Sequence, residues 1–191
     1  MAGPSMSGPL RGGLSDSGLS RSGLSVSSLS RRGMLGLGIG AAAAALAAPA
    51  LAIDKGYEAM LVNCIDPRFT TFSWSYMASH GYKDLYSHFV IAGGPIGIVS
   101  PKFADWHKAF WDNLAITIQL HAIKRVVGLT HRDCGAAAVA YGDRIKTDKA
   151  FETAMNVEAL HGFKSEIGKR QPKLAVDTGI MALDGGVEVV V

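Results

Sequence analysis

The sequence predicts an α/β fold with a mostly parallel central sheet flanked by helices. Short runs of apolar and β-branched residues recur along the chain, and longer segments with helical spacing of apolar residues lie between them. Strands that alternate with helices pair in parallel, since each helix returns the chain to the same edge of the sheet. Two of the short runs lead directly into clusters of Cys, His, Asp and Arg, which is where parallel sheets bind their ligands.

The expected strands are short apolar runs bounded by loop-forming residues. They are residues 59–64 (AMLVNC), 87–92 (SHFVIA) and 125–130 (RVVGLT). The second run is closed by Gly-Gly-Pro at residues 93–95. Residues 174–191 predict a C-terminal hairpin that turns at Asp-Gly-Gly, residues 184–186.

Two long helices are expected between and after these strands. In residues 103–123, apolar side chains recur at positions 103, 106, 110, 114 and 118, which is helical spacing over several turns. Residues 148–167 predict a second long helix, with Lys, Glu and Asn on one face. Residues 69–81 mix aromatic residues with Ser and Thr, and we expect a loop with a short helix there.

Both cysteines of the chain lie in the two clusters that follow expected strands. Residues 64–68 read Cys-Ile-Asp-Pro-Arg, and residues 131–135 read His-Arg-Asp-Cys-Gly. Two thiolates and an imidazole suit Zn²⁺, and three protein ligands leave a fourth position for water or substrate. The sequence therefore predicts a catalytic zinc site. Gly135 is expected to permit a sharp backbone turn next to it.

The two clusters resemble motifs of the β-class carbonic anhydrases, Cys-x-Asp-x-Arg after the first strand and His-x-x-Cys-Gly after a later strand. The matching residues are Cys64, Asp66, Arg68, His131, Cys134 and Gly135. The resemblance runs over residues 57–191. The family's Arg-Asn-Ala-Gly-Asn segment aligns with residues 91–95 (Ile-Ala-Gly-Gly-Pro), where only the small residues are kept.

The resemblance implies a lyase, a carbonate dehydratase that hydrates CO2 reversibly to bicarbonate with one Zn²⁺ per subunit. Cys64, His131 and Cys134 would bind the metal, and a zinc-bound hydroxide would attack CO2. Asp66 and Arg68 would be catalytic, because the arginine keeps the aspartate off the metal and the aspartate accepts a hydrogen bond from the hydroxide. The family builds its active site at a dimer interface, so a homodimer or a larger even oligomer is expected.

Several alternatives stay open at this point. The same scaffold could hydrolyse COS or CS2, because the pocket segment 91–95 departs from the family pattern. The chain could also be a non-catalytic zinc-binding homologue, in which Asp66 and Arg68 would form a plain salt bridge. Cys64 and Cys134 could instead pair as a disulfide in an oxidising compartment, but a disulfide leaves the Asp, Arg and His beside them unexplained.

Residues 1–52 are expected to be a leader rather than part of the fold. A five-residue Gly/Leu/Ser unit repeats over residues 13–30 and is typical of disordered low-complexity sequence. An Arg-Arg pair at residues 31–32 precedes a weakly hydrophobic Gly/Ala segment that ends in Ala-Leu-Ala at 50–52. This order resembles a twin-arginine (Tat) signal peptide. Residues 53–191 would then be a periplasmic zinc domain with no stable membrane insertion after cleavage; the alternative is an uncleaved membrane anchor.

The charge of the expected mature domain is balanced. The whole chain has a net charge of +3, but its first 52 residues hold four arginines and one aspartate, which leaves 15 basic and 15 acidic residues. A neutral domain argues against nucleic acid or an anionic membrane as a partner. The expected ligands are small molecules, CO2 and bicarbonate.

The remaining polar residues are weaker candidates. A structural role is expected for the histidines on the long helix, His107 and His121. Candidate proton shuttles, since an exposed histidine titrates near neutral pH, are His80, His88 and His161. Asp133, between two expected ligands, could tune them or simply be solvated.

Overall fold

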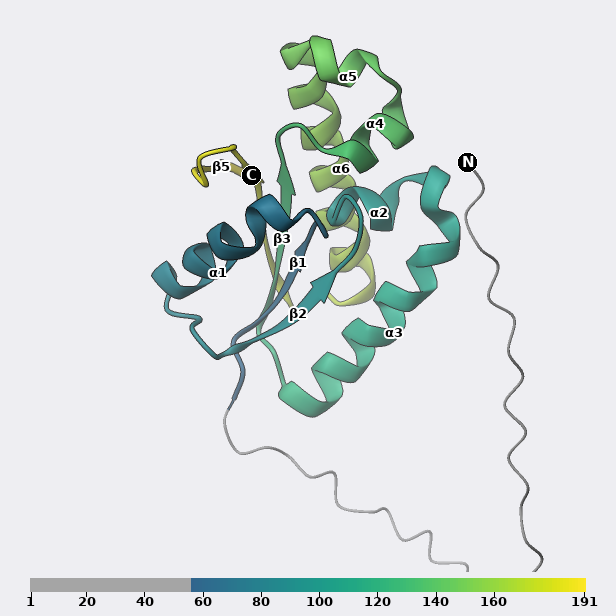
Figure 1. Cartoon of the computed structure of the whole chain (residues 1–191). Coiled ribbons are helices and arrows are strands. Elements are labelled where there is room, and N and C mark those ends of the chain that lie inside the picture. The colour runs from purple at the N-terminus through teal and green to yellow at the C-terminus, as the bar shows by residue number, and fades with distance from the viewer. Residues whose placement is uncertain (1–55) are drawn as a thin grey trace, which may run out of the picture. The chain divides into compact units, whose positions relative to one another are not determined.

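The computed structural model describes residues 56–191, so the expected leader and its boundary at residue 52 lie outside the described residues (Figure 1). The described chain contains a five-stranded sheet in the order β2-β1-β3-β4-β5. The strands are β1 (Ala59–Asn63), β2 (Tyr86–Val90), β3 (Arg125–His131), β4 (Ala175–Met181) and β5 (Val187–Val190). Strands β1 to β4 are parallel, and β5 is antiparallel to β4. The mostly parallel α/β fold and its C-terminal hairpin are confirmed.

Helices connect the strands and cover both faces of the sheet. They are α1 (Thr70–Ser79), α2 (Pro95–Val99), α3 (Ala104–His121), α4 (Gly135–Tyr141), α5 (Arg144–Thr147) and α6 (Lys149–Arg170). The two long helices expected at 103–123 and 148–167 correspond to α3 and α6. Within residues 56–191, no helix is both long enough and apolar enough to cross a membrane.

The two faces of the sheet pack against different helices, because side chains alternate between the faces of a strand. On one face, Met60 of β1 packs with Phe110 of α3 and Phe163 of α6. On the other face, Leu61 packs with Met77 of α1. Figure 1 shows the same division, with α1 on one side of the sheet and α2, α3 and α6 on the other. The carboxyl ends of the parallel strands are thereby held at one edge.

Residues 69–81 form more helix than the sequence predicts. Helix α1 covers ten of them, although Ser and Thr are weak helix formers. Met77 is fully buried in a cluster that also contains Phe69, and such tertiary packing supplies most of the stability of a protein helix. Helices α4 and α5 occupy a segment to which the sequence assigns no element.

Candidate metal centre

The two motif clusters meet at the carboxyl edge of the sheet. Cys64 directly follows β1, His131 is the last residue of β3, and Cys134 directly precedes α4. Because β1 and β3 are neighbouring parallel strands, these residues arrive at the same place. One ligand atom from each of the three residues lies within 4.8 Å of the other two, and all three residues are buried. The structure thus gathers the three expected ligands into one group that could bind a metal.

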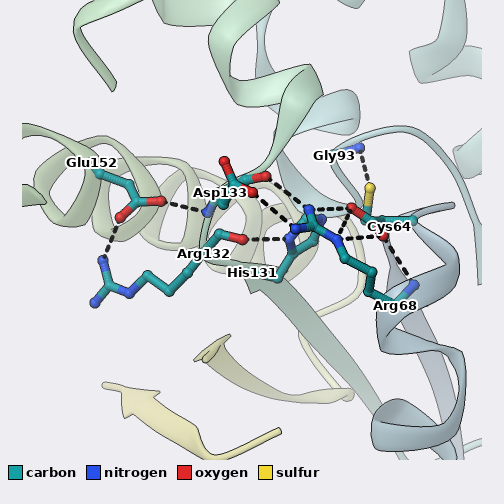
Figure 2. A network of polar contacts seen from close by, with 8 residues as sticks. Cys64, Arg68, Gly93, His131, Arg132, Asp133 and Glu152 are labelled. Atoms are coloured by element: carbon teal, nitrogen blue, oxygen red, sulfur yellow. Dashed lines mark hydrogen bonds and ion pairs between the residues drawn. The ribbon is translucent and has the colours of Figure 1, made fainter. Parts of the chain in front are cut away.

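The hydrogen bonding of His131 suits a metal ligand. Its Nδ1 lies 2.9 Å from the backbone carbonyl oxygen of Arg132 (Figure 2). A carbonyl oxygen only accepts, so in the neutral ring Nδ1 carries the proton and Nε2 keeps the lone pair that a metal needs. Nε2 is buried and has no hydrogen-bond partner. The ring also packs on Phe69, with the centroids 4.1 Å apart, which fixes its orientation.

The donor set fits zinc in type and in spacing. Tetrahedral zinc, with Zn–S of about 2.3 Å and Zn–N of about 2.0 Å, places its ligand atoms roughly 3.5 to 3.8 Å from one another. The three donors already lie within 4.8 Å of one another. Thiolate and imidazole are ligands that zinc prefers, whereas magnesium and calcium prefer oxygen.

One negative charge is stabilised between the two sulfurs. A hydrogen bond from the Cys134 thiol lowers the pKa of Cys64 to about 4, with help from His131 and from the Gly93 N–H. The same sharing raises the pKa of Cys134. Burial alone would lower the pKa of His131, but the Cys64 thiolate and the Arg132 carbonyl outweigh burial and raise it. A thiolate beside an imidazole favours uptake of a divalent cation, with release of protons.

The loop before α2 supplies a backbone donor to this group. The Gly93 N–H lies 3.2 Å from the Cys64 sulfur. The next residue, Gly94, has φ +55° and ψ −121°, and a Cβ there would lie 2.9 Å from the backbone of Asn63. The loop approaches β1 so closely that only glycine fits. A side chain at residue 94 would therefore displace the loop that carries the Gly93 donor.

Asp66 and Arg68 form a two-pronged ion pair beside the expected ligands. Nε of Arg68 lies 3.1 Å from both carboxylate oxygens of Asp66, and Nη2 lies 2.7 Å from Oδ2. These hydrogen bonds lower the pKa of Asp66, so its carboxyl group is ionised at neutral pH. The Asp66 side chain is 18% exposed and that of Arg68 is 49% exposed, whereas the three expected ligands are buried.

Arg68 also reaches the second cluster, which the sequence analysis does not anticipate. Its Nη1 donates to Oδ2 of Asp133 at 2.9 Å, and its Nη2 donates to the Asp133 carbonyl at 3.1 Å. Two roles were open for Asp133, tuning of the expected ligands or simple solvation. Asp133 is bonded directly to the motif arginine, so it is not simply solvated. In the sequence, this contact is indicated only by the opposite charges of Arg68 and Asp133 in two clusters expected at one edge of the sheet.

The sharp turn of the second cluster lies at Asp133, not at Gly135. Asp133 has φ +57°, in the left-handed region that Asp tolerates better than most residues. Gly135 is the first residue of α4, and a Cβ at this position would meet nothing within 4 Å. The expectation that Gly135 permits the turn is therefore wrong.

A buried carboxylate on α6, which no sequence motif marks, contacts the second cluster. Oε1 of Glu152 accepts a hydrogen bond from the backbone N–H of Asp133 at 2.7 Å. Its Oε2 lies 3.5 Å from Nη1 of Arg132, which also donates to Thr153. Glu152 belongs to a helix whose charged residues suggest a solvated face, so nothing in the sequence indicates its burial.

Histidines outside the clusters have local partners. His107 Nε2 lies 3.0 Å from the Ser100 carbonyl, and His121 Nδ1 lies 2.6 Å from the Ser87 hydroxyl. These contacts agree with the structural role expected for both. The exposed histidines remain candidate proton shuttles.

No protein-family model matches the chain. An uncharacterized protein of Rickettsia conorii is 32% identical to it over 129 residues, which are 68% of this chain and 69% of that protein. The chain belongs to the same family as this protein. An uncharacterized protein of Rickettsia bellii, 30% identical over 129 residues (68% of this chain and 79% of that protein), is a further relative.

Among solved structures, the chain resembles the β-carbonic anhydrase CafA of Aspergillus fumigatus. The TM-score is 0.50 at 16% sequence identity, and the superposition covers 74% of this chain and 78% of the fungal one. At this identity the similarity shows the fold. The chain therefore has the β-carbonic anhydrase fold, with a Cys-His-Cys group that could bind a metal.

Proposed function

We propose that the protein catalyses the reversible, zinc-dependent hydration of CO2 to bicarbonate. The observation that carries this proposal is the convergence of Cys64, His131 and Cys134 beside an Asp66 carboxylate that Arg68 holds with two nitrogens. Three protein donors leave one coordination position for water or substrate, as catalytic zinc sites do. The fold shared with a carbonic anhydrase supports the same reaction.

Cys64, His131 and Cys134 would hold the metal through their two Sγ atoms and Nε2. A zinc ion held by these residues would supply Lewis acidity, which in catalytic zinc sites brings the pKa of water to about 7. The chain prepares the ligands for this role. The Gly93 N–H supports the Cys64 thiolate, and the Arg132 carbonyl keeps the His131 proton on Nδ1.

Asp66 would orient the reacting water. Its carboxylate is ionised and fixed by Arg68, and it retains lone pairs that can accept a further hydrogen bond. Without the arginine, a carboxylate two residues from a ligand could turn and fill the open coordination position itself. Arg68 would therefore keep the site open as well as keep Asp66 charged.

Stopped-flow measurement of CO2 hydration on the zinc-loaded protein tests this function. We expect hydration well above the uncatalysed rate, loss of activity when a chelator removes the metal, and recovery when zinc is restored. Zinc-loaded protein that does not hydrate CO2 would overturn the proposal. Parallel assays with COS and CS2 then separate a hydrolase on the same site from a non-catalytic zinc-binding homologue.

We also propose that the active form is a homodimer or a larger even oligomer. Several apolar side chains are exposed in the single chain, namely Ile65 (61%) and Leu183 (57%), which follow β1 and β4, and Val139 (57%) on α4. Covering these side chains with a second copy would remove them from water.

Export to the periplasm by a twin-arginine signal is likewise a proposal. Its support is the Arg31-Arg32 pair followed by the Gly/Ala segment of the leader. The membrane-anchored form remains the competing proposal.

A further inference from the structure

One peptide group lies between a buried carboxylate and the proposed histidine ligand. Its carbonyl oxygen, from Arg132, accepts the Nδ1–H of His131 at 2.9 Å, and its N–H, from Asp133, donates to Oε1 of Glu152 at 2.7 Å. Figure 2 shows this line of contacts from Glu152 through the peptide to His131. We propose that Glu152 is a positioning residue of the metal centre that acts on His131 through this peptide. The inference rests on the zinc site proposed above.

The two hydrogen bonds polarise the peptide in the same direction. A carboxylate that accepts from the N–H side increases the negative charge on the carbonyl oxygen, because hydrogen bonds in a chain strengthen one another. The carbonyl then binds the Nδ1–H of His131 more strongly. A stronger partner at Nδ1 raises the basicity of Nε2, the nitrogen left for the metal, and fixes the tautomer. Glu152 would thus strengthen zinc binding without touching a ligand.

The surroundings of Glu152 supply hydrogen-bond donors and positive charge to its buried side chain. Glu152 is only 9% exposed, and a buried carboxylate is costly unless it is hydrogen-bonded and compensated. It lies in the first turn of α6, where the helix dipole stabilises negative charge. Arg132 supplies the compensating charge at 3.5 Å, but the shortest contact of the carboxylate is the 2.7 Å bond to the Asp133 N–H.

The same bond holds the turn that separates two proposed ligands. Asp133 adopts φ +57°, a conformation that most residues avoid. Glu152 binds its N–H, while Arg68 binds its carbonyl and its carboxylate from the other cluster. This turn sets the position of His131 relative to Cys134. A looser turn would therefore weaken metal binding as well.

The test compares two carboxylates that share Arg132. Glu188 lies 3.2 Å from Nη2 of this arginine, with a side chain that is 64% exposed, whereas the bond to the Asp133 N–H comes from Glu152. Glu152→Gln and Glu188→Gln each remove one negative charge next to Arg132, but only Glu152→Gln weakens the bond to the peptide. The affinity for zinc is measured by competition with a chromophoric chelator on metal-stripped full-length protein. We expect a loss of about 10-fold in Glu152→Gln, the lower end of the range for groups behind a metal ligand, and no change in Glu188→Gln.

Nuclear magnetic resonance provides a readout that a merely structural role would not move. In wild-type protein we expect the Asp133 amide proton far downfield, and the ¹⁵N shifts of His131 should report a protonated Nδ1. In Glu152→Gln the amide proton should move upfield and the His131 nitrogen shifts should change, while Glu188→Gln leaves both unchanged. If Glu152→Gln does not fold, the wild-type spectrum alone tests the role of Glu152. An Asp133 amide proton that is not shifted downfield in that spectrum would overturn the inference.

The outcomes separate this inference from the function on which it rests. Equal zinc affinity in wild type and Glu152→Gln, or an equal loss in Glu188→Gln, would overturn the role of Glu152 and leave the zinc site standing. Wild-type protein that binds no zinc would overturn the site itself. Neither readout depends on catalysis, so the CO2 assay does not enter the decision.

Discussion

Arg68 of the first cluster donates to both the carboxylate and the backbone carbonyl of Asp133 in the second, at 2.9 and 3.1 Å. The contact bridges 65 residues of sequence and ties the loop after β1 to the turn after β3. The same guanidinium holds Asp66 through Nε and Nη2. A single side chain therefore fixes both the proposed catalytic carboxylate and the turn between two ligands.

Arg68→Ala is expected to bind zinc at saturating metal, with a lower affinity because Asp133 loses two of its contacts, and to lose most CO2 hydration. Asp66, freed from its partner, can turn toward the open coordination position and displace the water that must react. The loss of stability should be small, because the Arg68 side chain is 49% exposed and exposed ion pairs contribute little. Zinc content and hydration rate are measured on the same samples.

Two further variants sharpen this experiment. Asp66→Ala combined with Arg68→Ala removes the carboxylate that would block the site, so weak activity should return. Asp133→Asn removes only the second ion pair of Arg68 and should retain zinc and most of the rate. Near wild-type turnover in zinc-loaded Arg68→Ala would mean that the pair only supports the loop.

Cys64→Ser and Cys134→Ser are each expected to lose zinc. A serine hydroxyl stays protonated near neutral pH, whereas the metal requires a deprotonated ligand. His161→Ala is a suitable control and should bind zinc as wild type does, because within residues 56–191 this exposed histidine bonds the Val191 carbonyl and none of the three expected ligands. Full zinc occupancy in either serine variant, measured by metal analysis, would contradict the ligand assignment.

The convergence of Cys64, His131 and Cys134 could be predicted from sequence because each residue stands in a local motif. Cys64 and His131 stand at the ends of apolar runs, and the rule that parallel strands share a carboxyl edge brings these ends together. Helices α3 and α6 could also be predicted from the sequence, because the helical spacing of their apolar residues persists over many turns. In α1 the residues are weak helix formers, and burial of Met77 decides the outcome.

The parts that could not be predicted depend on contacts distant in sequence. The bond from Asp133 to Glu152 joins residues 19 positions apart on different elements, and no periodic pattern marks it. The turn was assigned to Gly135 because glycine is the usual residue at positive φ. Asp133 takes that conformation instead, and Arg68 and Glu152 hold it there through contacts made only in the folded chain.

Replacement of Arg31 and Arg32 by lysine is expected to keep the protein in the cytoplasm. Twin-arginine export is read from the arginine pair itself, so a change that preserves charge should still block it. Arg21→Lys, within the Gly/Leu/Ser repeat, is the matched control and should not affect export. Cell fractionation measures the result, and periplasmic delivery of the Arg31→Lys, Arg32→Lys protein at wild-type levels would refute this route.

The zinc-loaded protein is expected to have the molar mass of a dimer or a larger even oligomer. The exposed apolar residues at the carboxyl edge, among them Ile65 and Leu183, favour a second copy on this face. Light scattering coupled to size-exclusion chromatography, with activity assayed across the peak, gives the mass of the active species. An active species that is strictly monomeric would contradict the expectation.

Gly94→Ala is expected to destabilise the protein strongly. The residue has φ +55°, and its new Cβ would lie 2.9 Å from the Asn63 carbonyl carbon and 3.0 Å from the Leu129 carbonyl oxygen. Both neighbours are backbone atoms of central strands and cannot move aside cheaply. Backbone strain of this kind, with the clash added, should cost about 2 kcal/mol or more.

Gly135→Ala is the matched control, since it adds the same methyl group to a motif glycine in open space. It lies in the first turn of α4 and its Cβ would meet nothing within 4 Å, so stability should be unchanged or up to about 1 kcal/mol higher. Thermal unfolding of both variants decides the comparison. Zinc affinity should fall only in Gly94→Ala, because moving this loop also shifts the Gly93 N–H away from the Cys64 sulfur. Equal unfolding temperatures for the two variants would show that the loop can relax. The Gly93 N–H would then not be held in a fixed position next to the Cys64 sulfur.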